Sequence, residues 1–449
     1  MSTNPLQLDL GDKRLDCRCN QLIDQLTRKP SASIPEACGS WKDTKAAYRF
    51  LTNEAVNPQK ILAAHTQAIK SKLQQETGII LVPQDTTDCD YTTHPQTKGL
   101  GYLQGQRLFG IKVHTALAVS EYGTPLGILS QKQWVRPLSE CEKRHHRVKE
   151  PLEQRESYRW ITTLQEAAKI IPADKLAVVI GDREAAMYEL FTTPRQSNIQ
   201  LLVRAKDRDV QNGQGKLFTT MEGVKPAGTL KLRLQRIPNR PAREVDLMVR
   251  FALVSIVSSD QTQACSLWCV MLKEQPSPTT TEKPIFWVLL TTLPITTFAK
   301  AVKLAQWYTH RWVIERFHYC LKSGCKIEEL QLQEESRLER AGVVYSLVAW
   351  KLLWLTYEAR EHPRESCERV LSSEEWQILV KLTETKQPLH TPPTMREAVR
   401  MIAQLGGFLA RKSDHDPGVK TLWRGLRRFT DMLTAWRIFK TQDEDVGKG

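Results

Sequence analysis

The chain has 449 residues, of which 41% are hydrophobic, and 64 lysines and arginines against 50 aspartates and glutamates give it a net charge of +14. This length exceeds what one ordinary hydrophobic core supports, so two or three domains are expected. The excess of cations favours a polyanionic partner, nucleic acid first, because cationic clusters release counterions when they neutralise phosphates. A basic surface without such a partner is the alternative. No apolar run approaches about 20 residues, which excludes a membrane-spanning helix.

Ten cysteines are scattered along a chain that begins with a polar segment and no apolar leader. The only close pairs lack the two-residue gap of a zinc knuckle or a redox motif. We therefore expect ten free thiols and a reducing, cytosolic compartment. These close pairs are Cys17 with Cys19, Cys265 with Cys269, and Cys320 with Cys325.

The first 58 residues or so have a helical, charge-rich pattern. Ser40 and Asp43 resemble a capping box that starts a helix over WKDTKAAYRF, Trp41 to Phe50. Cations beside aromatic rings suit a helix that contacts a DNA groove, since cations bind phosphate and flat side chains reach sugars and base edges. An amphipathic helix that packs its aromatic side chains inward is the alternative. The cations are Lys42, Lys45 and Arg49, and the aromatic residues are Trp41, Tyr48 and Phe50.

Apolar runs of strand length begin at Gly78. GIILV leads to PQDTT with Asp85, FGIKVHTALAVS and TPLGILSQKQWV follow as successive strands, and after a charged helical stretch (Cys141 to Ile171) KLAVVI leads to Gly181 and Asp182. Both GIILV and KLAVVI end in an acid. Such runs predict central buried strands, and an acid after each predicts a position at the edge of an α/β sheet.

The second half of the chain changes pattern twice. Residues 200–295 are mostly strand-like, which predicts a β-rich insertion closed by Phe286 to Leu290. Residues 297–361 return to a helical pattern, and from about 363 to the end the chain is helical with proline breaks. We find no internal repeat.

The stretch YTHRWVIERFHYCLK, Tyr308 to Lys322, predicts a helix with two distinct faces. At about 100° per residue, Tyr308, Arg311, Glu315 and Lys322 project within one stripe of roughly 60°. A carboxylate between two cations and a phenol suits binding of phosphate and a metal ion, whereas a solvated charged stripe is the alternative. The other side carries the expected core side chains Val313, Ile314, Phe317 and Leu321.

Context singles out three acids: Asp85, Asp182 and Glu315. Phosphoryl transfer on DNA can be run by two divalent ions about 3.5–4 Å apart, and carboxylates are the ligands that Mg²⁺ prefers. Three converging acids in a basic protein would supply such a site. Each acid can also be structural, because an aspartate after a strand is often a helix cap or a turn former. Asp88 and Asp90 lie near Asp85, so the first ligand is the least secure by spacing.

These residues carry a family resemblance. The spacing of Tyr308, Arg311, Glu315 and Lys322 resembles the tyrosine-arginine-glutamate-lysine signature of DDE transposases of the insertion-sequence-four family. QDTT around Asp85 and GDREA around Asp182 resemble the first and second catalytic aspartates of that family. AYRF (Ala47 to Phe50) and LGGF (Leu405 to Phe408) extend the resemblance to both ends of the chain, in the manner of the transposon-five type.

The resemblance implies an α/β fold with an RNase H-like catalytic core. Residues 1–58 would form an α-helical N-terminal DNA-binding domain, 59–362 the catalytic domain with its β insertion at about 200–295, and 363–449 an α-helical C-terminal dimerisation domain. The implied partners are double-stranded DNA, both the terminal inverted repeats and the target, and a second copy of the chain in a homodimer. The implied location is the bacterial cytoplasm, with the nucleoid and no membrane.

The resemblance also implies a cut-and-paste reaction. Asp85, Asp182 and Glu315 would be catalytic and would bind two Mg²⁺ ions, with Mn²⁺ as a substitute. Water would nick one strand, and the freed 3′-hydroxyl would attack the opposite strand to form a hairpin. A second water would open the hairpin, and the 3′-hydroxyl would finally attack target DNA. Trp287 of FWVLLT matches the tryptophan that receives a flipped base, although a core tryptophan is the alternative. The implied DNA contacts are Lys45, Tyr48, Arg49, Arg204, Lys206, Trp287, Tyr308, Arg311 and Lys322.

The sequence departs from the family pattern in two places. The family often has an aspartate after DREA, where this chain has Ala186, and much of the N-terminal region outside AYRF differs, so base-reading residues cannot be assigned. Two other functions stay open. One is a catalytically inactive or domesticated DNA-binding relative, which the three acids and a chain that includes the end-binding region both disfavour. The other is a metal-dependent DNA nuclease, which Trp287 and the C-terminal helices disfavour.

Overall fold

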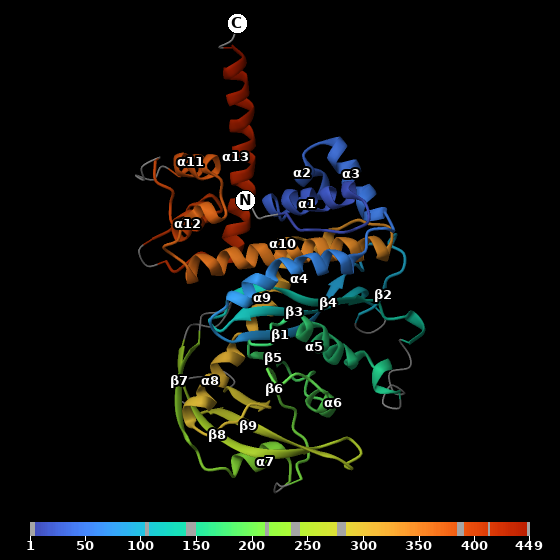
Figure 1. The fold of residues 1–449 in the computed structure, drawn as a ribbon, viewed down its shortest axis with the longest axis vertical. Coiled ribbons are helices and arrows are strands. Elements are labelled where there is room, and N and C mark those ends of the chain that lie inside the picture. The colour runs from blue at the N-terminus through green and yellow to red at the C-terminus, as the bar shows by residue number, and fades with distance from the viewer. Residues whose placement is uncertain are drawn as a thin grey trace.

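The computed structural model describes residues 5–103, 107–140, 150–211, 215–234, 243–275, 284–383, 390–411 and 414–446. A mixed sheet lies on one side of the long helix α10 (Glu335–Glu361), and helices from both ends of the chain lie on the other (Figure 1). The N-terminal helices are α1 (Lys13–Arg28), α2 (Ile34–Cys38) and α3 (Trp41–Thr52). The predicted cap of α3 is confirmed, because the Ser40 hydroxyl accepts from the Asp43 amide at 3.1 Å.

The central part of the sheet has the strand order β4-β3-β1-β5-β6. β1, β3 and β4 are antiparallel, whereas β1, β5 and β6 are parallel, which is the RNase H-like arrangement predicted from the sequence. Helices α4 (Pro58–Gln75) and α5 (Arg159–Ile170) pack against β4. The strands are β1 (Ile80–Asp90), β2 (Gly101–Tyr102), β3 (Phe109–Ser120), β4 (Pro125–Trp134), β5 (Ala177–Gly181) and β6 (Ile199–Arg204).

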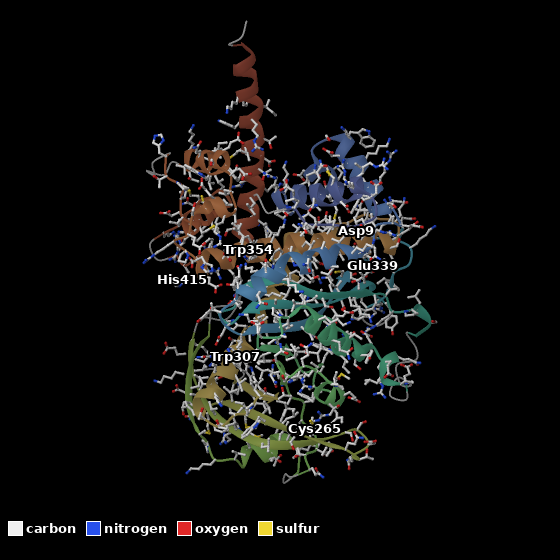
Figure 2. The ribbon with its side chains drawn as sticks, in the orientation of Figure 1. Asp9, Cys265, Trp307, Glu339, Trp354 and His415 are labelled. Atoms are coloured by element: carbon white, nitrogen blue, oxygen red, sulfur yellow. The ribbon has the colours of Figure 1, made fainter. Side chains whose placement is uncertain are left out.

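The β-rich insertion continues the same sheet. β10 pairs antiparallel with β6, and β9, β8 and β7 follow in order at the outer edge. Cys265 on β9 and Trp354 on α10 therefore lie at opposite sides of the central strands (Figure 2). The segment comprises α6 (Tyr188–Thr192), α7 (Leu217–Glu222), β7 (Gly228–Leu234), β8 (Arg243–Val257), β9 (Ala264–Glu274) and β10 (Phe286–Thr291).

Helix α10 joins the three parts of the molecule. It is buried nearly all round and contacts α1, α4, β4, α9, α12 and α13, so one apolar cluster runs from the N-terminal helices to the C-terminal ones. Helix α13 (Val419–Val446) projects beyond the rest (Figure 1). Its lower part packs on α12 (Met395–Leu405) through bare backbone, since a β-carbon at Gly425 would lie 1.7 Å from the Ile402 oxygen. Helix α11 (Ser373–Leu382) completes this end.

Two sequence expectations need correction. Asp85 does not stand at a strand end, because β1 continues to Asp90 as the antiparallel partner of β3 after its parallel pairing with β5 stops at Pro83. In addition, Tyr308 to Lys322 is not one helix. Helix α8 (Phe298–Thr309) ends before α9 (Trp312–Tyr319), and the π-helical turn η5 (Cys320–Gly324) follows.

The break between α8 and α9 has a tertiary cause. Hydrogen bonds from Arg311, Val313 and Ile314 run to the third preceding carbonyl, so the helix tightens there. The His310 ring packs against the β3–β4 turn at Gly123, whose φ of +102° and missing side chain leave room for it. The predicted core side is nevertheless confirmed: Val313, Ile314, Phe317 and Leu321 are buried.

The remaining chain-wide expectations concern cysteines and membranes. The nine cysteines in the described residues are all free thiols, and Cys141 lies outside those residues. The charged helical stretch predicted from Cys141 to Ile171 is helical from Leu152 onward, with two 3₁₀ turns before α5, and its residues 141–149 lie outside the described part. No helix in the described ranges combines the length and apolarity needed to cross a bilayer.

Candidate active site

Asp85 and Asp182 meet at one level of the sheet. In the parallel pairing of β1 with β5, Pro83 lies opposite Ile180, so Asp85 and Asp182 each come two residues after the last pair. The Asp85 Oδ1 accepts from the amide of Thr86 at 2.8 Å. The Asp182 Oδ1 accepts from the amide of Glu184 at 2.7 Å, which caps the turn after β5. Both carboxylates keep a second oxygen for other partners.

Glu315 is presented by the first turn of α9 and is held by Arg311. The Arg311 Nη2 donates to Glu315 Oε1 at 2.5 Å, and its Nη1 lies 3.8 Å from Asp85 Oδ2. The guanidinium thus stands between the carboxylates from β1 and α9. Its side chain is only 12% exposed, so this pairing is shielded from solvent.

The electrostatics of Asp85 report the proximity of the other two acids. The pKa of the Asp85 carboxyl is raised to about 6, first by burial and also by the charges of Asp182 and Glu315, while the Thr86 amide and Arg311 oppose the shift. The side chain is 21% exposed, so its charge is poorly solvated. A cation placed among these three carboxylates would offset the free-energy cost of holding a buried, poorly solvated negative charge.

The residues fit a divalent metal by their chemistry. Three carboxylates on three elements are a suitable oxygen donor set for Mg²⁺, which binds few protein ligands and keeps several waters. Within the described ranges, no three His, Cys, Asp or Glu side chains are gathered in a formed metal site. Arg311 lies between two of the three carboxylates, bonded to Glu315 and 3.8 Å from Asp85.

The other nearby acids already have structural partners. Asp88 pairs with Lys112 at 2.6 Å, and Asp90 accepts from the amide and hydroxyl of Thr92. Ala186, at the position where the family often has an aspartate, is buried. Among the acids on β1, Asp85 is therefore the one that faces Asp182 and Glu315.

Tyr308, Trp287 and Arg204 form a second cluster beside Arg311. The rings of Trp287 on β10 and Tyr308 on α8 meet edge to face, with centroids 5.5 Å apart. Arg204, at the end of β6, donates from Nη2 to the Phe286 carbonyl at 3.1 Å, and burial lowers its pKa. The Tyr308 hydroxyl and the Nε atoms of Arg204 and Arg311 are buried and, within the described residues, lack a hydrogen-bond partner. Buried donors without partners mark a place for a ligand.

Lys322 and Lys206 lie outside this cluster. The π-turn η5 directs the Lys322 ammonium to the Asp88 carbonyl at 2.8 Å and to Glu328 at 2.9 Å, so it contacts β1 three residues beyond Asp85. Lys206 is exposed after β6. The predicted stripe of four side chains therefore separates into Tyr308, Arg311 and Glu315 on one side and Lys322 on the other.

Helix α3 presents the mixed surface that its sequence predicts. Trp41 is 79% exposed, Lys45 and Arg49 are exposed, and Tyr48 is half-buried, whereas Phe50 packs in the core. Trp41, Lys45, Tyr48 and Arg49 line one shallow hollow. Trp41 therefore faces outward, as expected for a DNA-contacting helix, whereas Phe50 packs inward, as expected for an amphipathic helix.

One buried arginine near the site was missed in the sequence. Arg159, the first residue of α5, bonds Thr86 beside Asp85 and Glu184 beside Asp182. The sequence around Arg159 does not indicate these contacts, because the two partners lie 73 and 25 residues away along the chain. Only the folded arrangement identifies it.

The raised pKa of Asp85 predicts a pH-dependent cost to stability. The native state holds the proton up to about pH 6, whereas the unfolded chain loses it near pH 3.9. Stability therefore falls as pH rises between these values and stays lower above them. We expect Asp85→Asn to stabilise the metal-free protein at pH 7.5 by up to about 3 kcal/mol.

Thermal unfolding in EDTA at a series of pH values measures this effect. The Tm difference between Asp85→Asn and the natural protein should be small near pH 4 and should grow toward pH 7. The same change at the exposed Asp9 is the control and should give no such trend. A Tm difference that does not depend on pH would contradict the assignment.

Three family models match this chain, and their order agrees with its architecture. "Transposase DNA-binding" matches residues 3–56, "Transposase DDE domain" matches 159–350, and "Transposase Tn5 dimerisation domain" matches 347–445. The DDE match contains Asp182 and Glu315, while Asp85 precedes it on β1. A helical DNA-binding part, a sheet with converging carboxylates and a helical dimerisation part follow one another in this order. The chain therefore belongs to the DDE transposases of the Tn5 type.

Proposed function

We propose that this transposase excises an insertion sequence and joins it to target DNA by a cut-and-paste reaction. Water nicks one strand at the transposon end, the released 3′-hydroxyl attacks the opposite strand to form a hairpin, a second water opens the hairpin, and the 3′-hydroxyl attacks target DNA. The observation that supports this proposal most is the convergence of the three acids, since the charges of Asp182 and Glu315 raise the pKa of Asp85 and Arg311 lies between Asp85 and Glu315. Such a group of acids suits metal-assisted phosphoryl transfer.

Asp85, Asp182 and Glu315 would hold two Mg²⁺ ions, for which Mn²⁺ would substitute. Bound ions would polarise the attacking oxygen and stabilise the leaving oxygen. Arg311 pairs with the carboxylates of Asp85 and Glu315. Once another cation neutralises these acids, the guanidinium becomes available for a phosphate of the DNA end, for which its planar donors are well suited.

The partnerless donors beside Arg311 support a phosphate site next to the acids. Tyr308, Arg204 and Arg311 together offer a buried hydroxyl and two guanidinium Nε groups to a DNA-end phosphate. Trp287 stands against Tyr308 and offers a ring face for an extruded base. Lys206 and Lys322 would contact the flanking backbone, and Lys45, Tyr48 and Arg49 of α3 would bind the inverted repeat.

The decisive experiment uses purified protein, Mg²⁺ and DNA that carries the inverted repeats flanking the gene. We expect nicked ends, hairpins and joined products on sequencing gels. Asp85→Ala, Asp182→Ala and Glu315→Ala should each abolish nicking while retaining end binding in a gel-shift assay. Cleavage without joining would favour a metal-dependent nuclease, and binding without cleavage an inactive DNA-binding relative. Retained cleavage in one variant would overturn the assignment of that acid.

Tyr308→Phe tests the phosphate site without disturbing the fold. Its hydroxyl is buried without a partner in the described residues, so removing it should leave Tm unchanged or slightly raised. If that hydroxyl donates to a DNA phosphate, hairpin formation should slow roughly tenfold, the effect of about 1.4 kcal/mol lost from a charge-assisted hydrogen bond. The half-buried Tyr48, changed to Phe, should weaken end binding instead. An unchanged hairpin rate in Tyr308→Phe would remove its hydroxyl from the site.

The dimerisation domain predicts a complex with two DNA ends, and α13 offers the surface for it. Met432 and Phe439 are 42% and 65% exposed and, with Trp436 between them, lie on one face of α13 by helical spacing. We propose that this face meets the same face of a second copy. We expect the protein to work where its DNA lies, in the bacterial cytoplasm with the nucleoid.

Phe439→Glu should prevent pairing of two ends, because a charge would be buried against apolar side chains. Single-end complexes should persist in native gels, and the two-end complex should disappear. Thr434→Glu is the matched control, since the same charge then lies on the opposite side of α13. Equal loss of the two-end complex in both variants would contradict an interface along this face.

A further inference from the structure

Arg159 connects the segments that carry Asp85 and Asp182. Its side chain is 9% exposed, and it donates from three nitrogens: Nε to the Thr86 hydroxyl at 3.0 Å, Nη1 to the Glu156 carbonyl at 2.9 Å, and Nη2 to the Glu184 carboxylate at 2.6 Å. The rings of Trp134 and Trp160 each lie 5.7 Å from the guanidinium carbon. This packing leaves the guanidinium little freedom to move.

On the Asp85 side, the hydrogen bond to Thr86 continues into a buried series of hydrogen bonds. Arginine can only donate, so the Thr86 hydroxyl accepts from Arg159, and the same hydroxyl lies 2.8 Å from His114 Nδ1. Gln84 Oε1, 3.4 Å from the other ring nitrogen of His114, can only accept, so that nitrogen carries the proton and Nδ1 of the neutral ring accepts from Thr86. Burial lowers the pKa of His114 well below its ordinary value, which agrees with this neutral form.

This series of hydrogen bonds holds both sequence neighbours of Asp85. Gln84 and Thr86 lie on the opposite face of β1 from Asp85, because side chains alternate along a strand. Fixing the residues on either side fixes the backbone that presents Asp85. The register of β1 with β3 adds to this, since Thr86 lies directly opposite His114.

On the Asp182 side, the ion pair with Glu184 reaches the turn after β5. The Glu184 amide donates to Asp182 Oδ1 at 2.7 Å, so Glu184 is bonded both to Asp182 through its backbone and to Arg159 through its side chain. β1 and β5 pair only as far as Pro83 and Ile180. Beyond that point, no backbone bond between these two strands holds the two aspartates at a set spacing.

We propose that Arg159 is a positioning residue that sets the spacing of Asp85 and Asp182 for metal binding. Like charges on the two aspartates push apart the segments that carry them, and the path Thr86–Arg159–Glu184 resists this. Arg159 touches neither aspartate and acts through their neighbours. The inference rests on the proposed function of the two aspartates as metal ligands.

Arg159→Lys tests the proposal, because lysine keeps the charge but is a single compact donor that cannot span the three partners. The full-length protein is bound to a pre-cleaved transposon end without target DNA, so that no chemistry occurs, and free Mn²⁺ is measured by electron paramagnetic resonance. We expect Mn²⁺ binding to weaken roughly 10- to 100-fold, as for other residues that orient metal ligands. Affinity for the DNA end should be unchanged.

Arg155→Lys is the matched control. Arg155 lies four residues earlier, donates to the Glu150 carbonyl and lies 3.9 Å from Glu189. It should keep the Mn²⁺ affinity of the natural protein. If Arg159→Lys also keeps that affinity, or if both variants lose it equally, Arg159 does not set the spacing of the aspartates.

Glu184→Gln keeps the proposal testable if Arg159→Lys fails to fold. Its side chain is 64% exposed, so the change should not disturb packing. We expect a weaker loss of Mn²⁺ affinity than in Arg159→Lys, and the double variant should bind no more weakly than Arg159→Lys alone, because both changes break one path. Strictly additive losses would overturn the single path.

The Mn²⁺ measurement also separates this proposal from the proposed function. If the natural protein binds Mn²⁺ but produces no nicks, the function is wrong and the role of Arg159 is still tested. If Asp85→Ala binds Mn²⁺ as tightly as the natural protein, the aspartates are not metal ligands and the role of Arg159 falls with them.

Discussion

The repulsion of the buried Asp85 carboxylate by two neighbouring acids is the constraint on which the site depends. The fold places Asp85, Asp182 and Glu315 close enough to raise the pKa of Asp85, and burial adds to the cost. A protein that keeps such acids ionised needs cations nearby. Two arginines lie near these acids. Arg311 pairs directly with two of them, and Arg159 holds the segments that carry the two aspartates.

Arg311 pairs directly with the acids and is placed by the break between α8 and α9. Its guanidinium lies between the carboxylates of Asp85 and Glu315, where a bound cation would compete with it. Arg159 contacts only the neighbours of the aspartates, so its bonds can persist when a metal binds. Arg311 would exchange partners during the reaction, whereas Arg159 would keep its hydrogen bonds.

Helix α10 links this site to the parts that bind DNA and the second copy. It packs on α1 and α3 at one end and on α12 and α13 at the other, and it also contacts α9, which carries Glu315. Close-packed interiors deform little, so α10 fixes the position of α9 relative to the helices packed at its two ends.

The sequence by itself singled out the three acids and determined the central strands and the cap of α3, because nearby residues encode each. Asp85 and Asp182 follow apolar runs, which also predict the strands, Glu315 lies on a polar helix face, and Ser40 with Asp43 forms the cap. The sequence did not reveal that β1 runs through Asp85, that α8 ends at Thr309, or that Lys322 turns toward Asp88. Tertiary structure decided these, and the role of Arg159, because strand register and helix packing join residues far apart in the chain.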